Sequence, residues 1–232
     1  MQLEPIPPKG QDAGAGALGY IAPFAVFVLL LAVRRWIPLQ PEVWVPVRLV
    51  LVTGVVAVFS RRVMPWPPVF PIGSILLGAA VLVIWIGPDL IWHGYRDSWL
   101  FHNSITGVAA SSLPPRLKTN ALFIGARVTE SIILVPILEE LFWRGWLMRW
   151  LIHTDFRSVP LGQYTHFSFW MVAALFASEH GPYWEVGLAA GIAYNSWLVR
   201  TRSLADCILA HAVTNALLAA YVLLNDQWQY WL

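Results

Sequence analysis

The chain has 232 residues, of which 58% are hydrophobic and only 12% are charged, and its mean hydropathy is +0.60. Because ordinary soluble domains carry about 25% charged residues, this composition excludes a soluble globular protein and indicates a polytopic membrane protein. The net charge of +2 comes from basic residues scattered between the apolar runs, so the sequence predicts no nucleic-acid partner.

Residues 1–17 are rich in Pro, Gly and Ala and show no apolar periodicity, which predicts a flexible N-terminal tail. Residues 18–232 are expected to form a single transmembrane helical domain, because only short polar joints separate their apolar runs. We predict an all-α polytopic transmembrane bundle of about seven to eight helices, the eighth if the segment after Glu140 spans alone. The runs that approach the ~20 residues needed to span a bilayer are 18–33, 43–59, 70–92, 121–138, 167–178, 183–199 and 204–224.

Two adjacent acids, Glu139 and Glu140, stand at the end of the fourth run. An acid at the bilayer centre costs roughly 2.5 to 3.5 kcal/mol on insertion scales, so such groups normally pair, face a polar cavity or do chemistry. On a helix Arg144 shares a face with Glu140, whereas Glu139 lies about 100° round the axis. We therefore expect Arg144 to hold Glu140 and Glu139 to face elsewhere. The alternative is a helix start at the interface with solvated acids. Upstream, the spacing of Arg127 and Glu130 fits an internal ion pair.

Further polar residues lie in the later runs. His180 follows the fifth run, where it could be a general base, a metal ligand or an interfacial residue; Glu179 beside it could be solvated. His211 and Asn215 lie in the last run, four residues apart, and so share one helix face. They present two hydrogen-bonding groups to a common cavity or to a helix contact.

Carboxylates, imidazoles and an amide that project from three helices could together activate a water molecule. A carboxylate and an imidazole provide general-base catalysis, while a second imidazole and an amide can stabilise the oxyanion of a tetrahedral intermediate. Acyl transfer to water is the reaction class that such groups suit.

The three motifs EExxxR, FxxxH and HxxxN, in this order on successive hydrophobic segments, resemble those of the CPBP intramembrane protease family. This family includes the type II CAAX prenyl endopeptidases and bacteriocin-processing or self-immunity proteins. The resemblance covers a protease-like core at about 121–224, and residues 138–152 and 194–228 are similar to bacterial CAAX-protease-related proteins of exosortase systems. The motif positions are Glu139, Glu140 and Arg144, then Phe176 and His180, then His211 and Asn215.

The resemblance implies an intramembrane endopeptidase that hydrolyses a peptide bond of a membrane-associated protein or peptide, lipidated or exosortase-linked. It places the chain in a bacterial inner membrane, in contact with membrane lipid. It assigns activation of the attacking water to Glu139 and His180, the oxyanion hole to His211 and Asn215, and the organisation of the site to Glu140 and Arg144.

We expect no metal and no other cofactor. Zinc is the alternative, with Glu139, His180 and His211 as ligands of acceptable type. The chain lacks an HExxH motif, however, and a glutamate-activated water needs no ion. Two other functions stay open: a non-catalytic membrane scaffold or immunity protein, and a small-solute transporter, which would place ionisable groups in the bundle but predicts symmetric halves.

Overall fold

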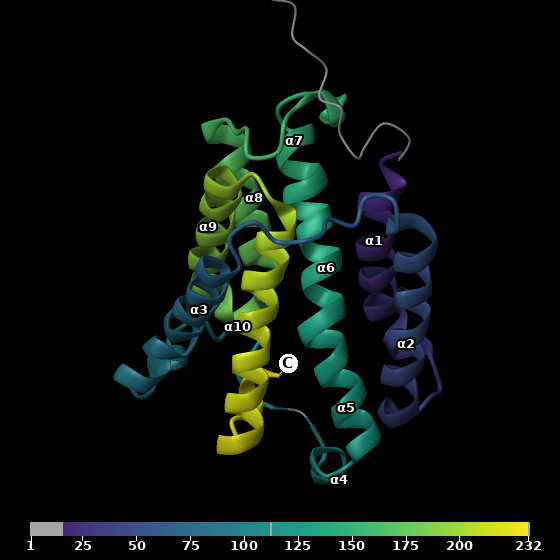
Figure 1. The fold of residues 1–232 in the computed structure, drawn as a ribbon. Helices are drawn as coiled ribbons and strands as arrows, with labels where there is room; N and C mark the ends of the chain where they lie inside the picture. The colour runs from purple at the N-terminus through teal and green to yellow at the C-terminus, as the bar shows by residue number, and fades with distance from the viewer. Residues whose placement is uncertain (1–15, 112, 232) are drawn as a thin grey trace, which may run out of the picture.

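The protein is built from helices that lie side by side in a bundle (Figure 1). The computed structural model describes residues 16–111 and 113–231, so most of the tail predicted for residues 1–17 lies outside the described residues. Within the described residues there is no β-strand, and the predicted all-α class is confirmed.

The long helices follow one another in alternating direction through the bundle (Figure 1). The α-helices are α1 (Leu18–Ala32), α2 (Pro41–Val55), α3 (Pro71–Ile91), α4 (Pro115–Lys118), α5 (Ala121–Thr129), α6 (Val135–Glu140), α7 (Met148–Trp150), α8 (His166–Ser178), α9 (Trp184–Thr201) and α10 (Leu204–Asn225). π-helical segments occur at Val56–Ser60, Glu130–Leu134 and Leu141–Leu147. Short 3₁₀ helices occur at Val33–Trp36, Tyr95–Asp97, Phe156–Ser158, Gly181–Tyr183 and Trp228–Tyr230.

Helices α5, α6 and α7 form one continuous helix of 30 residues, because π-helical segments join them without a break. The prediction that this span ends at residue 138 is wrong, and so is the separate eighth span after Glu140. Pro136 does not end the helix, since it lies near the start of α6, directly after a π-helical turn in which the ordinary hydrogen-bond register has already changed.

Among the residues that the structure describes, five helices are long and apolar enough to cross a membrane: Leu18–Trp36, Pro41–Ser60, Pro71–Ile91, Ala121–Trp150 and Leu204–Asn225. These confirm five of the seven predicted spans. The run 167–178 gives α8, whose 13 residues reach only about 20 Å, short of the roughly 30 Å hydrocarbon layer. The run 183–199 gives α9, which is not among the candidate spans because polar residues interrupt its apolar sequence.

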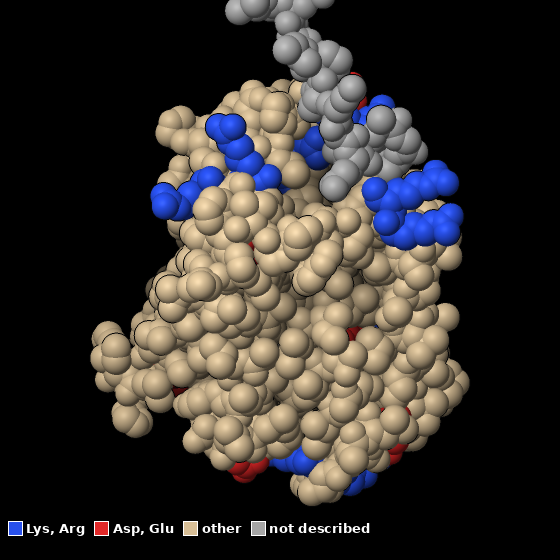
Figure 2. Space-filling view, viewed as in Figure 1, with Lys and Arg blue, Asp and Glu red and all other residues tan. Residues whose placement is uncertain are grey.

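Lys and Arg side chains gather at the two ends of the molecule, and Figure 2 shows a nearly uncharged band between them. Inside the bundle, both oxygens of the buried Glu130 carboxylate accept hydrogen bonds from Arg48 on α2, at 2.8 and 2.6 Å. The sequence suggested Arg127 as the partner of Glu130 and missed Arg48, because helix spacing cannot reveal a partner 82 residues away.

A buried carboxylate fixes α10 against the start of α3. Asp206, in the first turn of α10, accepts hydrogen bonds from the backbone N–H groups of Val69 and Phe70, both at 2.7 Å, and from the Ser74 hydroxyl at 2.8 Å. Negative charge is favourable at a helix N-terminus, where backbone N–H groups lack partners within the helix. Asp206 therefore holds the residues that lead into α3 and places its charge near the N-terminus of that helix.

We predict that Asp206→Ala lowers the free energy of unfolding by about 1 to 3 kcal/mol, because the buried Ser74 hydroxyl and two backbone N–H groups before α3 lose their acceptor. Thermal unfolding in detergent, followed by tryptophan fluorescence, measures the change. Asp155→Ala is the control, since Asp155 pairs with Arg157 on the exposed surface and such pairs contribute little. Equal unfolding temperatures for the two variants would contradict this role of Asp206.

Candidate active site

Glu139 and Glu140 are the last two residues of α6, which lies within the long helix that runs from Ala121 to Trp150. A π-helical segment lies on either side of α6, at Glu130–Leu134 and Leu141–Leu147. Such segments often mark functional sites, because the extra residue in the turn changes the direction of the side chains that follow.

The π-helical turn before α6 also explains how Asn215 is held. The N–H of Val135 donates to the carbonyl of Glu130, five residues earlier. In the same register, the carbonyl of Ser131 would accept from residue 136, but Pro136 has no N–H. Asn215 Nδ2 on α10 donates to this carbonyl at 2.8 Å, which fixes the amide and leaves its second N–H proton for another acceptor.

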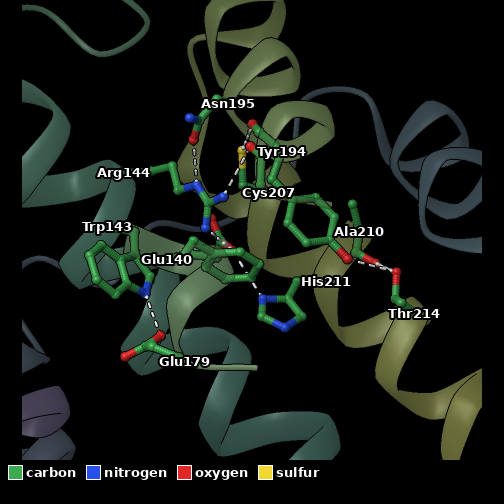
Figure 3. Close-up of polar contacts among 12 residues, drawn as sticks. Glu140, Trp143, Arg144, Glu179, Tyr194, Asn195, Cys207, Ala210, His211 and Thr214 are labelled. Atoms are coloured by element: carbon green, nitrogen blue, oxygen red, sulfur yellow. Dashed lines mark hydrogen bonds and ion pairs between the residues drawn. The ribbon is translucent and has the colours of Figure 1, made fainter. Parts of the chain in front are cut away.

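The ion pair expected between Glu140 and Arg144 is present. Glu140 is fully buried, and its Oε1 accepts from Arg144 Nη1 at 3.1 Å. The same oxygen accepts from His211 Nδ1 at 3.0 Å, because a carboxylate oxygen beside the ring can only accept (Figure 3). Glu140 therefore joins the first motif to the third and sets the orientation of the His211 ring.

Arg144 is held by partners on α9 that the sequence analysis did not identify. Its Nε donates to Asn195 Oδ1 at 2.9 Å, and its Nη2 donates to the Gly191 carbonyl at 3.3 Å. The guanidinium also lies over the Phe176 ring, 4.5 Å from its centroid. Asn195 could have been found by the same criterion as Asn215, since it is an amide within an apolar run.

His180 follows the end of α8 and turns back on that helix. Its Nδ1 lies 2.7 Å from the Phe176 carbonyl and donates to it, so in the neutral ring Nε2 carries the lone pair. The edge of Trp85 from α3 packs against the ring with centroids 5.1 Å apart. His180 is thus a half-buried, oriented imidazole whose second nitrogen has no part in the bond to the backbone.

The His211 ring is stacked on a second residue that the sequence did not indicate. The ring of Tyr194 on α9 lies 5.1 Å from it at an angle of 21°. The Tyr194 hydroxyl donates to Thr214 Oγ1 at 2.8 Å, which fixes the tyrosine to α10. The stack and the Glu140 bond together restrict the imidazole to one plane.

The four residues predicted to be catalytic line one cavity of about 290 Å³: Glu139, His180, His211 and Asn215. This is close to the lower end of the volumes of small-molecule sites, about 300 Å³. The two predicted site-organising residues are not among the described residues that line it, and lie behind this wall. Glu139 and Glu140 thus face different ways, as their positions on the helix predicted.

Glu139 and Glu140 each bury an Oε2 atom that has no donor among the described residues within hydrogen-bond distance. They differ in that Glu140 also has an Oε1 atom that accepts hydrogen bonds from Arg144 and His211. Glu179, by contrast, is exposed and accepts from Trp143 Nε1 at 3.2 Å (Figure 3). The alternative of a solvated acid therefore holds in part for Glu179, whose side chain is exposed. It does not hold for Glu139, whose Oε2 is buried.

The three residues named for zinc line one cavity but are not gathered around one point. Within the described part of the chain, no three His, Cys, Asp or Glu side chains come close enough together to hold a metal ion. Glu139, His180 and His211 share a cavity wall without forming such a cluster. We derive no catalytic step through a metal.

Comparison with known families identifies the same part of the chain. Residues 121–217 match the family model described as Type II CAAX prenyl endopeptidase Rce1-like. Over these residues the chain is similar to the Rce1-like family. The match begins at the first residue of α5, contains every predicted site residue and leaves α1 to α3 outside. No curated protein and no solved structure matches the chain.

The Rce1-like match and the five candidate spans establish an integral membrane protein, and at the family level they indicate a CAAX-type endopeptidase. The match also places the three motifs in one family segment, in the order in which the sequence presents them.

We predict that Arg144→Ala lowers the free energy of unfolding by about 3 to 5 kcal/mol, because Glu140 loses its counter-charge in a fully buried position. Thermal unfolding in detergent measures the loss. Arg157→Ala provides the control, since its partner Asp155 is on the surface. An unfolding temperature unchanged by Arg144→Ala would show that this pair does not stabilise the fold.

Proposed function

We propose that the protein is an intramembrane endopeptidase that hydrolyses a peptide bond of a membrane-associated substrate with a glutamate-activated water. The observation that supports this most is the common cavity of Glu139, His180, His211 and Asn215, which come from three separate segments of the chain. The reaction is acyl transfer to water, as these groups and the Rce1-like match both suggest.

In the proposed reaction Glu139 and His180 activate the water. The buried Oε2 of Glu139 has no protein donor among the described residues, and His180 Nε2 has a lone pair when Nδ1 donates to the backbone. One of these bases takes a proton from the water as its oxygen bonds to the carbonyl carbon. The proton then passes to the amide nitrogen as the carbon–nitrogen bond breaks, which gives a carboxylic acid and an amine.

We assign the stabilisation of the oxyanion, which forms on the carbonyl oxygen of the substrate, to His211 and Asn215. One Asn215 N–H bonds to the Ser131 carbonyl, and the second is available for the oxyanion. His211 already donates through Nδ1 to Glu140, so donation through Nε2 requires a ring that carries both protons. Glu140 would then act as the counter-charge of this imidazolium, which gives the second glutamate a role distinct from the first.

The cavity wall also supports a substrate that approaches within the membrane. Phe27 and Leu31 of α1 line the cavity together with the polar residues, and Leu31 is 44% exposed on the outside of the bundle. In Figure 2 acidic atoms are visible in a hollow within the uncharged band. A peptide with an apolar or lipidated anchor could reach such an opening from the lipid.

We further propose a bacterial inner membrane as the location, and a lipidated or exosortase-linked protein as the substrate. The sequence similarity noted for residues 138–152 and 194–228 is the support for the exosortase link. A pull-down with the inactive Glu139→Gln variant would identify the substrate.

We predict that Glu139→Gln lowers turnover by at least ~100-fold while the fold is kept, because glutamine preserves size and hydrogen bonding but is no base. Cleavage of an internally quenched, lipid-anchored peptide in proteoliposomes measures turnover. Glu42→Gln is the matched control, since Glu42 lies at the start of α2 and pairs with Arg116. Retained cleavage by Glu139→Gln would defeat the assignment.

Alanine variants of His180, His211 and Asn215 separate the protease from a non-catalytic scaffold. A protease loses cleavage in each folded variant, whereas a scaffold or immunity protein keeps its biological effect in all of them.

Metal independence is likewise part of the proposal. We predict that dialysis against a strong chelator leaves the cleavage rate unchanged, because the proposed bases require no ion. The rate of the same peptide cleavage before and after dialysis measures this, with a zinc endopeptidase treated in parallel as the control. Activity that is lost on dialysis and restored by zinc would overturn metal-free catalysis.

A further inference from the structure

The chain turns back on itself after α10 and enters the wall of the candidate active site. Asp226 adopts a left-handed conformation, with φ of 57°, and the N–H groups of Asp226 and Gln227 both donate to the Val222 carbonyl. We call residues 226–231 the return segment. In Figure 1 the yellow end of the chain lies between α10 and α6.

The return segment buries its aromatic residues. Trp228, Tyr230 and Trp231 are each at most 8% exposed. Tyr230 and Trp231 line the same cavity as Glu139 and His180. The segment therefore occupies space directly beside the groups that we propose to act on a peptide.

Ring contacts connect the return segment to His180. The Tyr230 ring lies 5.3 Å from that of Tyr183, and the Tyr183 ring lies 6.3 Å from that of Trp85. Trp85 in turn packs against His180 at 5.1 Å. The aromatic surface between the return segment and the imidazole is thus continuous, and suits apolar or aromatic side chains of an extended chain.

Hydroxyl hydrogen bonds tie the return segment to the bundle. The Tyr230 hydroxyl donates to Asp89 Oδ2 at 2.8 Å, and the Tyr183 hydroxyl donates to the Gln229 carbonyl at 3.1 Å. The segment is short, and it follows a chain reversal at Asp226. Loss of one of these bonds would weaken the attachment of the segment, which its buried rings also maintain.

We propose that the return segment is bound, within the molecule, in the subsite that receives a stretch of the peptide substrate next to the scissile bond. This inference rests on the proposed endopeptidase function. The subsite takes an extended peptide with an aromatic side chain, and the return segment competes with that peptide. Because substrate binds only when the segment is displaced, the apparent affinity equals the intrinsic affinity multiplied by the displaced fraction.

Tyr230→Phe tests the competition, because it removes the bond to Asp89 and keeps the buried ring. A lost hydrogen bond to a charged acceptor changes an equilibrium by roughly tenfold or more. We predict that KM for an internally quenched, lipid-anchored peptide that carries an aromatic residue falls about tenfold while kcat is unchanged. Tyr183→Phe removes the bond to Gln229 and should change KM in the same direction.

Tyr164→Phe is the matched control, since Tyr164 is 45% exposed on the connection before α8 and should leave KM and kcat unchanged. The free peptide with the sequence of residues 227–231 should inhibit Tyr230→Phe more strongly than the unaltered protein. A KM for Tyr230→Phe that is unchanged or raised would show that the return segment is a fixed wall of the cavity, and would overturn the proposal.

A second measurement does not depend on proteolysis. Ser131 lines the cavity, so a thiol in Ser131→Cys reports access to it, with the fully buried Cys207 of the unaltered protein as background. Tyr230→Phe should accelerate alkylation of this thiol by a small maleimide several-fold, and equal rates would overturn the proposal. Accelerated alkylation without peptide cleavage by any variant would leave the segment a gate and reject the endopeptidase function.

Discussion

The site depends on one buried carboxylate oxygen that accepts hydrogen bonds from two groups, of which one is cationic and the other can become so. Glu140 Oε1 binds Arg144 from its own helix and His211 from α10, and Asn195 on α9 holds the far side of the guanidinium. A charge buried at this depth is tolerated only when opposite charge and hydrogen bonds compensate it. This requirement joins three helices at one point and so fixes the cavity wall.

The same requirement determines what the adjacent residue can do. Neighbours on a helix point about 100° apart, so a Glu140 directed at Arg144 leaves Glu139 directed at the cavity. The π-helical segments and Pro136 contribute on the same helix, because they free the Ser131 carbonyl that positions Asn215. The π-helical segments and the buried ion pair thus lie on the same 30-residue helix, and both help to position the residues that line the cavity.

Contacts within one helix could be predicted from the sequence, whereas contacts between helices could not. The pair Glu140 and Arg144 follows from a spacing of four, and the all-α class follows from composition. The partner of Glu130 is Arg48, on another helix, and Asn195, an amide within an apolar run, binds Arg144 from α9. Spacing carries no information about which helices become neighbours, so these partners required the fold.

The acids of the bundle differ in how they are compensated, and this difference supports Glu139 as the reactive group. Glu130 accepts twice from Arg48, and Asp206 accepts from backbone N–H groups and a hydroxyl. Glu140 accepts from two side chains through Oε1, while its Oε2 is buried without a donor among the described residues. Glu139 Oε2 is buried without a donor among the described residues, a situation that costs about 1 to 3 kcal/mol or more for a charged group. Glu130, Glu140 and Asp206 each accept at least two hydrogen bonds from described residues, which offset the cost of their burial, and no such bond offsets that cost at Glu139 Oε2. The proposed activation of water in the cavity that Glu139 lines would account for that cost.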